Sequence, residues 1–177
     1  FGFARHGIVP DMITMGKPMG NGIPISGLAA KEDVLAAFSD KLPYFNTFGG
    51  NPVSIAAAQA VLKYIKDENL QEHCKKAGAA LLKALKEVQE RHPESVGDVR
   101  GAGLFLGFEF VKNDGNKTPD KDMALNVIEM LRDEHILTSV IGHYGNILKL
   151  RPPMVFSEND IDWFATSLDK CITKLEN

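Results

Sequence analysis

The amino-acid sequence predicts an α/β fold. Short β-prone apolar runs alternate along the chain with stretches whose apolar residues recur at helical spacing. A glycine-rich segment follows the first β-prone run, and one long amphipathic stripe separates the first third of the chain from the rest. Alternation of these two periodicities is typical of proteins that pack helices against a sheet.

The first third begins as a strand that leads into a loop. Residues 8–15 are β-prone, and three glycines and a proline fall within residues 16–22. A second apolar run covers residues 23–30. Residues 31–38 have a helical pattern with two acidic residues in the first turn, where they suit the helix dipole.

Two helices are predicted next. After a loop at residues 43–52, the alanine-rich residues 53–65 have the propensity of a buried helix, and Pro52 suits its first turn. Residues 70–88 are predicted to form a long amphipathic helix. Its apolar stripe consists of Leu70, Cys74, Ala77, Leu81, Leu85 and Val88.

The remainder is predicted to be a strand-helix-strand-strand-helix unit. Residues 104–111 form a buried strand within residues 96–111, bent or closely approached at its glycines. Ser157 and Asp160 resemble a capping box at the start of the last helix. The other elements are a helix at 121–134, strands at 136–140 and 147–150, and that last helix at 158–175. We place a domain boundary near residue 70, which gives domains at 1–69 and 70–177.

The composition excludes several classes of function. The 20 basic and 23 acidic residues are not gathered into blocks, so neither a nucleic-acid surface nor a membrane-binding helix is expected. No apolar run approaches the roughly 20 residues that span a bilayer. The two cysteines are far apart and the five histidines lack metal-ligand spacing, so we expect no disulfide and no metal site. The histidines are assigned to surface or capping roles.

Lys17 is the first candidate for chemistry. It lies between Gly16 and Pro18, where the residue before proline is biased to extended conformations and a glycine lets other groups approach. Such a loop can direct one amine into a pocket, as a lysine that forms a Schiff base requires. An ordinary turn with a solvated lysine is the alternative for an isolated Gly-Lys-Pro.

The surrounding residues favour the Schiff base. Residues 9–25, which read VPDMITMGKPMGNGIPI, resemble the lysine segment of the class-III aminotransferases. The resemblance is strongest to the branch with alanine–glyoxylate aminotransferase 2-like enzymes and phospho-lyases of ethanolamine phosphate and phosphohydroxylysine. It implies that Lys17 holds pyridoxal 5'-phosphate. It also implies a fold-type I transferase, in which residues 1–69 end the large cofactor-binding domain and residues 70–177 form the small C-terminal domain.

A second segment supports the resemblance. Residues 44–54, which read YFNTFGGNPVS, resemble the family loop that crosses a dimer interface. The resemblance implies that the Thr47 hydroxyl binds the cofactor phosphate of the partner subunit, and hence a homodimer. The adjacent Gly49 and Gly50 suit this role, because bare backbone can approach a phosphate. Residues 99–107 resemble the strand that opens the small domain, and we leave Arg100 out of the site.

The third segment departs from the common pattern. Residues 146–156 read NILKLRPPMVF, and many class-III aminotransferases have an arginine where Lys149 stands, to bind the substrate carboxylate. The arginine here is Arg151. Arginine forms two parallel hydrogen bonds with a carboxylate, whereas lysine is a point charge. The phospho-lyase branch also has lysine in this column, so Lys149 and Arg151 are expected to bind an amino acid or a phosphorylated amine. The alternative is that one of the two cations is a solvated residue of an edge strand.

The resemblance implies an enzyme that acts on small molecules. The first hypothesis is a transaminase that moves an amino group between an amino donor and a keto acid. A phospho-lyase acting on a phosphorylated amine is the alternative from another reaction class, and a non-catalytic dimerising fragment is the third. We expect a cytoplasmic protein, or a mitochondrial one if an upstream targeting segment exists.

The chain itself is expected to be a fragment, because it begins with Phe1 and its first element belongs to the middle of the family fold. The resemblance places the other cofactor contacts before residue 1: an aspartate, a glycine-rich phosphate loop and an aromatic ring. We therefore expect the isolated 177 residues to be inactive.

Overall fold

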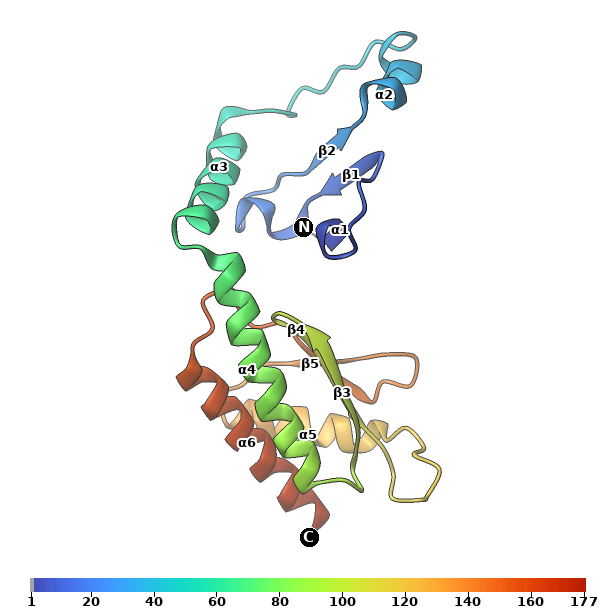
Figure 1. The fold of residues 1–177 in the computed structure, drawn as a ribbon, viewed down its shortest axis with the longest axis vertical. Coiled ribbons are helices and arrows are strands. Elements are labelled where there is room, and N and C mark those ends of the chain that lie inside the picture. Colours follow the sequence, from blue (N-terminus) through green and yellow to red (C-terminus); the bar gives the residue numbers. More distant parts are fainter. Residues whose placement is uncertain (1) are drawn as a thin grey trace. The chain divides into compact units, whose positions relative to one another are not determined.

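The chain divides into two compact units, Phe1–Glu68 and Asn69–Asn177, in the computed structural model, which describes residues 2–177 (Figure 1). We call them unit 1 and unit 2. The expected boundary near residue 70 lies next to this division. The assignment of unit 1 to the end of a large cofactor-binding domain stays a prediction.

Unit 1 contains an antiparallel pair of short strands, β1 (Met12–Met15) and β2 (Gly27–Ala30). The first strand is shorter than the β-prone run at residues 8–15. Just before β1 begins, the Asp11 carboxylate accepts a hydrogen bond of 2.6 Å from the ammonium of Lys31, which follows β2. The other elements of the unit are α1 (Gly2–Arg5), the 3₁₀ helix η1 (Lys17–Gly20), α2 (Glu32–Ser39) and α3 (Pro52–Asp67).

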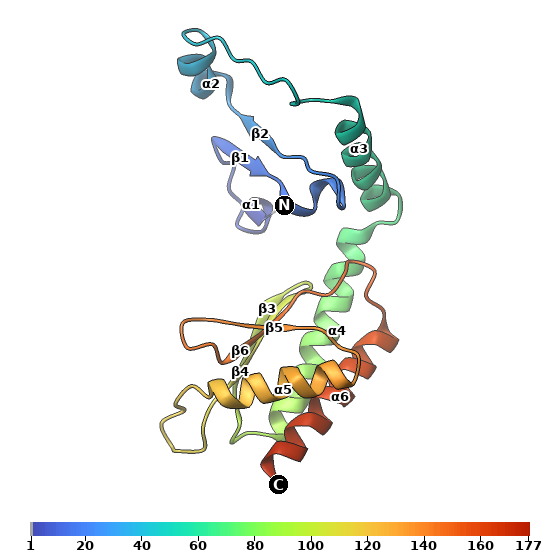
Figure 2. The same ribbon diagram turned by 180° about the vertical axis from the view of Figure 1, so that it is seen from behind.

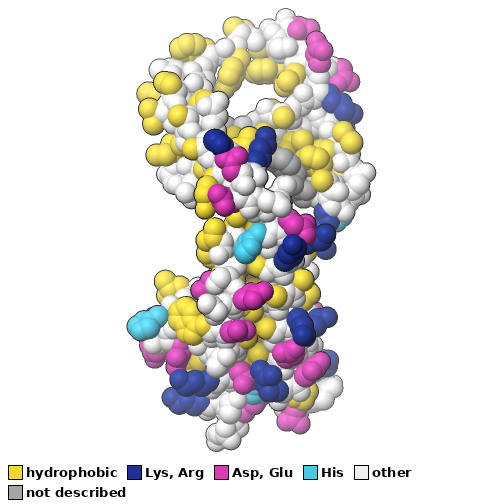
Figure 3. All heavy atoms as spheres, turned by 60° about the vertical axis from the view of Figure 1, so that its left-hand side comes forward, with side chains coloured by type: hydrophobic (Ala, Val, Ile, Leu, Met, Phe, Trp, Pro, Cys, Tyr) yellow, Lys and Arg dark blue, Asp and Glu magenta, His cyan; other side chains and the backbone are white. Residues whose placement is uncertain are grey.

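Helix α3 begins as the sequence predicts. Its N-cap residue is Asn51, whose side chain accepts a hydrogen bond from the Ser54 N–H, and Pro52 occupies the first turn. The prediction that this helix is buried is wrong, because none of its residues is buried. Within unit 1 the helix packs against η1, which leaves Val53 69% and Tyr64 54% exposed. Figure 3 shows hydrophobic side chains on the surface of this unit.

Unit 2 is a four-stranded antiparallel sheet in the order β3-β4-β6-β5 with three helices. Figure 2 shows the sheet and helices from behind. Its elements are α4 (Leu70–Arg91), β3 (Val96–Ala102), β4 (Phe105–Phe110), α5 (Lys121–Asp133), β5 (Ser139–Ile141), β6 (Ile147–Leu150) and α6 (Glu158–Glu176). The Ser157–Asp160 capping box is present at the start of α6, as the sequence predicts.

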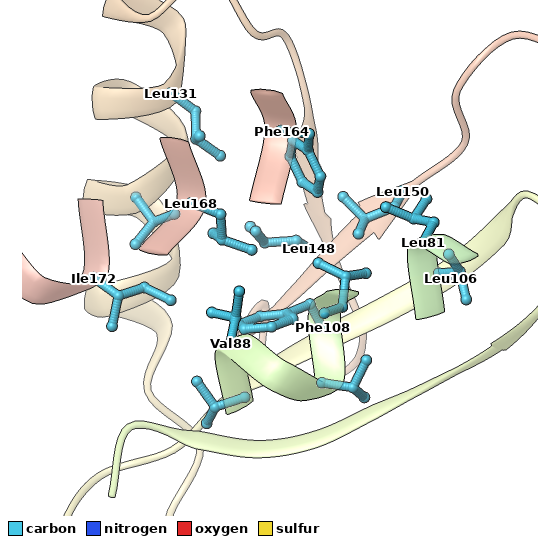
Figure 4. Packing of buried hydrophobic residues seen from close by; sticks show 14 of the residues in the cluster. Leu81, Val88, Leu106, Phe108, Leu131, Leu148, Leu150, Phe164, Leu168 and Ile172 are labelled. Atoms are coloured by element: carbon cyan, nitrogen blue, oxygen red, sulfur yellow. The ribbon is translucent and has the colours of Figure 1, made fainter. Parts of the chain in front are cut away.

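The core lies between one face of this sheet and the helices. Alternate residues of β4 and β6 are buried, which gives each strand one core-facing side. Phe108 of β4 is fully buried and meets Phe110 edge to face at 5.3 Å between ring centroids. Figure 4 shows side chains of α4, α5 and α6 converging on those of the sheet. Four residues of the predicted α4 stripe belong to this core: Ala77, Leu81, Leu85 and Val88. Leu70 is buried outside the cluster, and Cys74 is only partly buried.

The buried strand predicted at residues 104–111 is confirmed as β4, but β3, for which no separate strand was predicted, precedes it and pairs with it as a hairpin. Strands β3 and β4 pair in antiparallel register from Ala102 opposite Phe105 onward. Gly103 lies in the turn with a φ of 53°, in the left-handed region that favours glycine. The turn therefore reverses the chain at a position where a bend in one strand was expected.

His92, for which a surface or capping role was predicted, is the C-cap residue of α4, but its side chain is buried and does not lie on the surface. Its side chain is 6% exposed. Nδ1 lies 2.7 Å from Glu176 Oε2, and Nε2 lies 3.0 Å from Asp169 Oδ1. Carboxylate oxygens only accept, so each ring nitrogen that carries a hydrogen in this arrangement donates it to its carboxylate. Arg91 donates to the same Asp169 oxygen at 2.7 Å, so the cluster links the end of α4 to α6.

Candidate functional site

Lys17 lies at the start of η1 with a φ of 51°, which is uncommon for a residue other than glycine. The residue before it, Gly16, lies close to Ser26. A Cβ atom added to Gly16 would be 3.6 Å from the Cβ of Ser26. The Lys17 side chain is exposed, and none of residues 2–177 forms a hydrogen bond or ion pair with its amine. The backbone conformation therefore sets the point from which this free amine extends.

Close packing shapes the rest of the lysine loop. Gly20 is buried, and a Cβ at this position would lie 2.9 Å from Ile25 Cγ2. Asn21 adopts the left-handed conformation and donates its N–H to the Pro18 carbonyl at 2.9 Å. The Ser54 hydroxyl in α3 donates to the Pro24 carbonyl at 3.2 Å. The loop is thereby tied to the first turn of α3.

Thr47 lies in the exposed loop before α3. Its neighbour Asn46 organises the loop, because the Asn46 side-chain oxygen accepts hydrogen bonds from the N–H groups of Phe48 and Gly49 at 3.2 and 2.9 Å. Gly50 has a φ of 72°, so it turns the chain toward the helix. The Thr47 hydroxyl itself has no hydrogen-bond partner in the part of the chain that the structure describes.

These two groups fit the predicted cofactor. Pyridoxal 5'-phosphate has an aldehyde, with which a free amine reacts, and a phosphate, which accepts hydrogen bonds from hydroxyls. Lys17 supplies the first kind of group and Thr47 the second.

Lys149 and Arg151 come together in unit 2. Lys149 lies in β6, where it is paired with Gly107 of β4 and Ser139 of β5. Arg151 follows the end of the strand and is exposed. Both residues line a cavity of about 520 Å³. Neither side chain has a hydrogen bond or ion pair with another described residue, so both cations are available to an anion.

Other residues of this cavity were not predicted as site residues. Phe156, Trp163 and Phe164 form aromatic walls, and Asp160 adds a carboxylate. Hydrogen bonds from the Ser157 side chain and backbone lower the pKa of Asp160, so it is anionic at neutral pH. The sequence indicated Asp160 only as a capping residue. The sequence did not indicate Trp163, because the position of a residue in a helix does not show which loop its side chain faces.

The described residues contain neither a metal site nor a membrane span. No group of three or more His, Cys, Asp or Glu among residues 2–177 is arranged to hold a metal ion. None of the helices that the structure describes is both long and apolar enough to cross a bilayer.

Comparisons with known proteins were made at the level of sequence and of fold. A sequence model of the family described as class-III aminotransferase matches residues 1–172. An ethanolamine-phosphate phospho-lyase homolog of Caenorhabditis elegans is 45% identical over 94% of this chain and 36% of its own length. A mitochondrial alanine–glyoxylate aminotransferase 2 homolog of Arabidopsis thaliana is 37% identical over 99% of this chain and 36% of its own length.

A solved structure is also similar. A phospholyase from Arthrobacter, determined in complex with phosphoethanolamine, superposes with a TM-score of 0.93 at 37% identity, over 98% of this chain and 41% of that one. The chain thus spans between a third and a half of the length of these relatives.

Proposed function

The chain belongs to the class-III aminotransferase family, and from this premise we propose that the full-length protein is a phospho-lyase that removes phosphate from a phosphorylated amine. The family depends on pyridoxal 5'-phosphate, and the predicted α/β fold of the fold-type I transferases is confirmed by the similar structures. The observation that carries the proposal is the pair of unpartnered cations, Lys149 and Arg151, on one cavity.

Two cations favour a phosphate over a single carboxylate. A phosphate monoester approaches a charge of −2 at neutral pH and has three strong acceptor oxygens. Lys149 supplies a compact charge, and Arg151 supplies a planar fork for two oxygens. The similarity to a phospho-lyase homolog and to a phospholyase structure supports the same conclusion.

Each residue has a proposed role in the elimination. The cofactor, when bound, serves as a sink for the electron pair that remains when a substrate C–H bond breaks. Lys17 would hold the cofactor and, once its amine is free, accept the proton from the substrate α-carbon. The electron pair of that C–H bond would form a carbon–carbon double bond as the neighbouring C–O bond breaks, and the C–O electron pair would leave with the phosphate. Lys149 and Arg151 stabilise the charge on this leaving group.

Thr47 is proposed to act across a dimer. Its free hydroxyl donates a hydrogen bond to the cofactor phosphate of the partner subunit, so each active site contains residues of two chains. The exposed aromatic side chains Tyr44, Phe45 and Phe48 in the same loop support this proposal, because a protein surface rarely gathers such groups without an interface.

Transamination is the second candidate function. It was the first hypothesis from the resemblance of the lysine segment. The similarity to the Arabidopsis aminotransferase homolog favours it. In this reaction Lys17 returns the proton to a different carbon and a keto acid is released, with no loss of phosphate. The same lysine serves both reactions, so the outcome depends on the groups around the substrate.

The test uses the full-length holoenzyme with phosphoethanolamine and, separately, with alanine and glyoxylate. The proposal predicts release of inorganic phosphate that is lost in Lys17→Ala and reduced in Lys149→Gln. Production of pyruvate from alanine without phosphate release from phosphoethanolamine would establish the transaminase instead.

A non-catalytic dimerising protein is the third possibility. A spectroscopic measurement distinguishes it from a phospho-lyase and from a transaminase. A lysine-bound cofactor absorbs at about 410–430 nm and can be fixed to its lysine by borohydride. The proposal predicts this band and a borohydride adduct on Lys17. Absence of both from the full-length protein would leave only a dimerising or binding role.

A further inference from the structure

The loop that joins β6 to α6, residues 151–157, is fixed at both ends. We call it the proline loop. Leu150, just before it, is 5% exposed and belongs to the core. Ser157, at its other end, exchanges hydrogen bonds with Asp160 in the capping box of α6. Arg151 is the first residue of this loop, so its position depends on how the loop is held.

The middle of the loop is bound by helix α4. His73 Nε2 lies 3.0 Å from the Phe156 carbonyl oxygen in a partly buried contact. Since a carbonyl only accepts, Nε2 carries the hydrogen and donates it. The next residue, Cys74, directs its Sγ at the Met154 carbonyl at 3.6 Å. Burial raises the pKa of the Cys74 thiol, so it stays protonated and can serve as a weak donor.

Few backbone torsions are free between Arg151 and the point where His73 binds. Pro152 and Pro153 each have a fixed φ, and a residue before proline is restricted to extended conformations. The Phe156 N–H donates to the Pro153 carbonyl at 3.0 Å and closes the following turn. The two prolines and this turn restrict the loop, so we expect a displacement of its Phe156 end to alter the position of Arg151.

Lys149 is held in a different way. It lies within β6, which pairs with β4 on one side and β5 on the other. The sheet fixes its backbone whether or not α4 contacts the proline loop. The Arg151 side chain has no partner among residues 2–177, so only its backbone sets where the guanidinium can reach.

From these contacts we infer that His73 is a positioning residue, which holds Arg151 in place for an anionic group through the proline loop. The inference rests on the proposed role of Arg151 as an anion-binding residue. His73 acts at a distance and touches no ligand itself. Its effect is confined to the arginine half of the cation pair.

The test measures the affinity of the full-length holoenzyme for inorganic phosphate and for succinate by calorimetry. The variant His73→Leu removes the donor, whereas His73→Gln keeps an amide N–H at a similar reach. We expect His73→Leu to weaken phosphate binding by about threefold to tenfold, as the loss of one hydrogen bond would. His73→Gln should bind within about twofold of the wild type, and Gln71→Leu, on the exposed side of α4, is the matched control.

A double-mutant cycle separates positioning from general loss of structure. If His73 acts through Arg151, His73→Leu has little further effect in an Arg151→Gln background and its full effect in a Lys149→Gln background. An equal effect in both backgrounds, or unchanged affinity in His73→Leu, would overturn the inference, as would failure of the wild type to bind either anion. Failure of the proposed function shows itself separately, as the absence of phosphate release from phosphoethanolamine by a protein that still binds anions.

Discussion

Gly78 of helix α4 touches the backbone of Gly103 in the β3-β4 turn. A Cβ placed on Gly78 would lie 2.2 Å from the Gly103 carbonyl oxygen and 2.3 Å from its carbonyl carbon. Contacts this short are incompatible with any side chain, and the obstructing atoms are backbone. The helix and the hairpin are therefore packed together at a point that only glycine allows.

Gly78→Ala is expected to destabilise unit 2. In an exposed helix this change would stabilise by about 1 kcal/mol through helix propensity. Overpacking against Gly103 should reverse the sign and cost about 1–3 kcal/mol. The thermal midpoint of the full-length protein measures the outcome, with Gln89→Ala on the same helix as a propensity control. A higher midpoint for Gly78→Ala would contradict the close approach.

The His92 cluster should also contribute to stability. His92→Leu removes the hydrogen bonds of the imidazole to Asp169 and Glu176, while Asp169 keeps Arg91 and Glu176 keeps Ser95. We expect a loss of about 1–3 kcal/mol in the free energy of unfolding, the usual net contribution of two hydrogen bonds. His92→Gln keeps one donor and should lose less. Equal stability of the two variants would show that burial alone determines the effect.

Much of the fold could be predicted because local patterns agree with tertiary packing. The stripe of α4 has the period of a helix, and the capping box of α6 is a local signal that packing did not override. The β3-β4 hairpin was missed because the turn at Gly103 lies within an apolar run, without the polar residues that usually mark a reversal. Exposure of α3 was missed because periodicity does not show whether a partner is present.

The candidate site could be predicted only in part, for a similar reason. Lys17 and Thr47 lie in segments with distinctive residue order, and their roles stay predictions. The cavity beside Lys149 and Arg151 also uses Trp163 and Asp160, which are brought there by the packing of α6. His73 had no signal because its partner is a backbone carbonyl 83 residues away. A contact to the main chain cannot be predicted from residue types, because every residue has a backbone carbonyl.

Acid should weaken unit 2 in part through Asp169. Burial opposes ionisation of this carboxyl, but hydrogen bonds and charges from Arg91 and His92 hold its pKa below the ordinary value. Because the pKa of Asp169 is lower in the folded state than in the unfolded state, its carboxylate contributes its full stabilisation above the unfolded-state pKa of about 4. This stabilisation is lost as the pH falls from that value through the pKa of the folded state. The midpoint of Asp169→Asn should therefore fall less than that of the wild type between about pH 6 and pH 3.

The control for this measurement is Asp162→Asn, which changes an exposed carboxyl on the same helix. Its midpoint should follow that of the wild type across the acid range. Parallel curves for the wild type and Asp169→Asn would contradict a stabilising role for the Asp169 carboxylate.

Ser54 is expected to support the lysine loop from outside the site. Its hydroxyl donates to the Pro24 carbonyl at 3.2 Å, and its N–H is capped by Asn51. Ser54→Ala removes the first contact, and with it the hydrogen bond of 3.1 Å that the hydroxyl accepts from Asn51 Nδ2. The bond from the Ser54 N–H to Asn51 remains, so α3 should still begin at Pro52. Loosening of the segment after Lys17 should then weaken cofactor binding by the full-length protein by about threefold to tenfold, the effect of one hydrogen bond. Asn51→Ala, by contrast, acts on the helix start, and a cofactor affinity lowered by Asn51→Ala but not by Ser54→Ala would show that the helix, and not the hydroxyl, holds the loop.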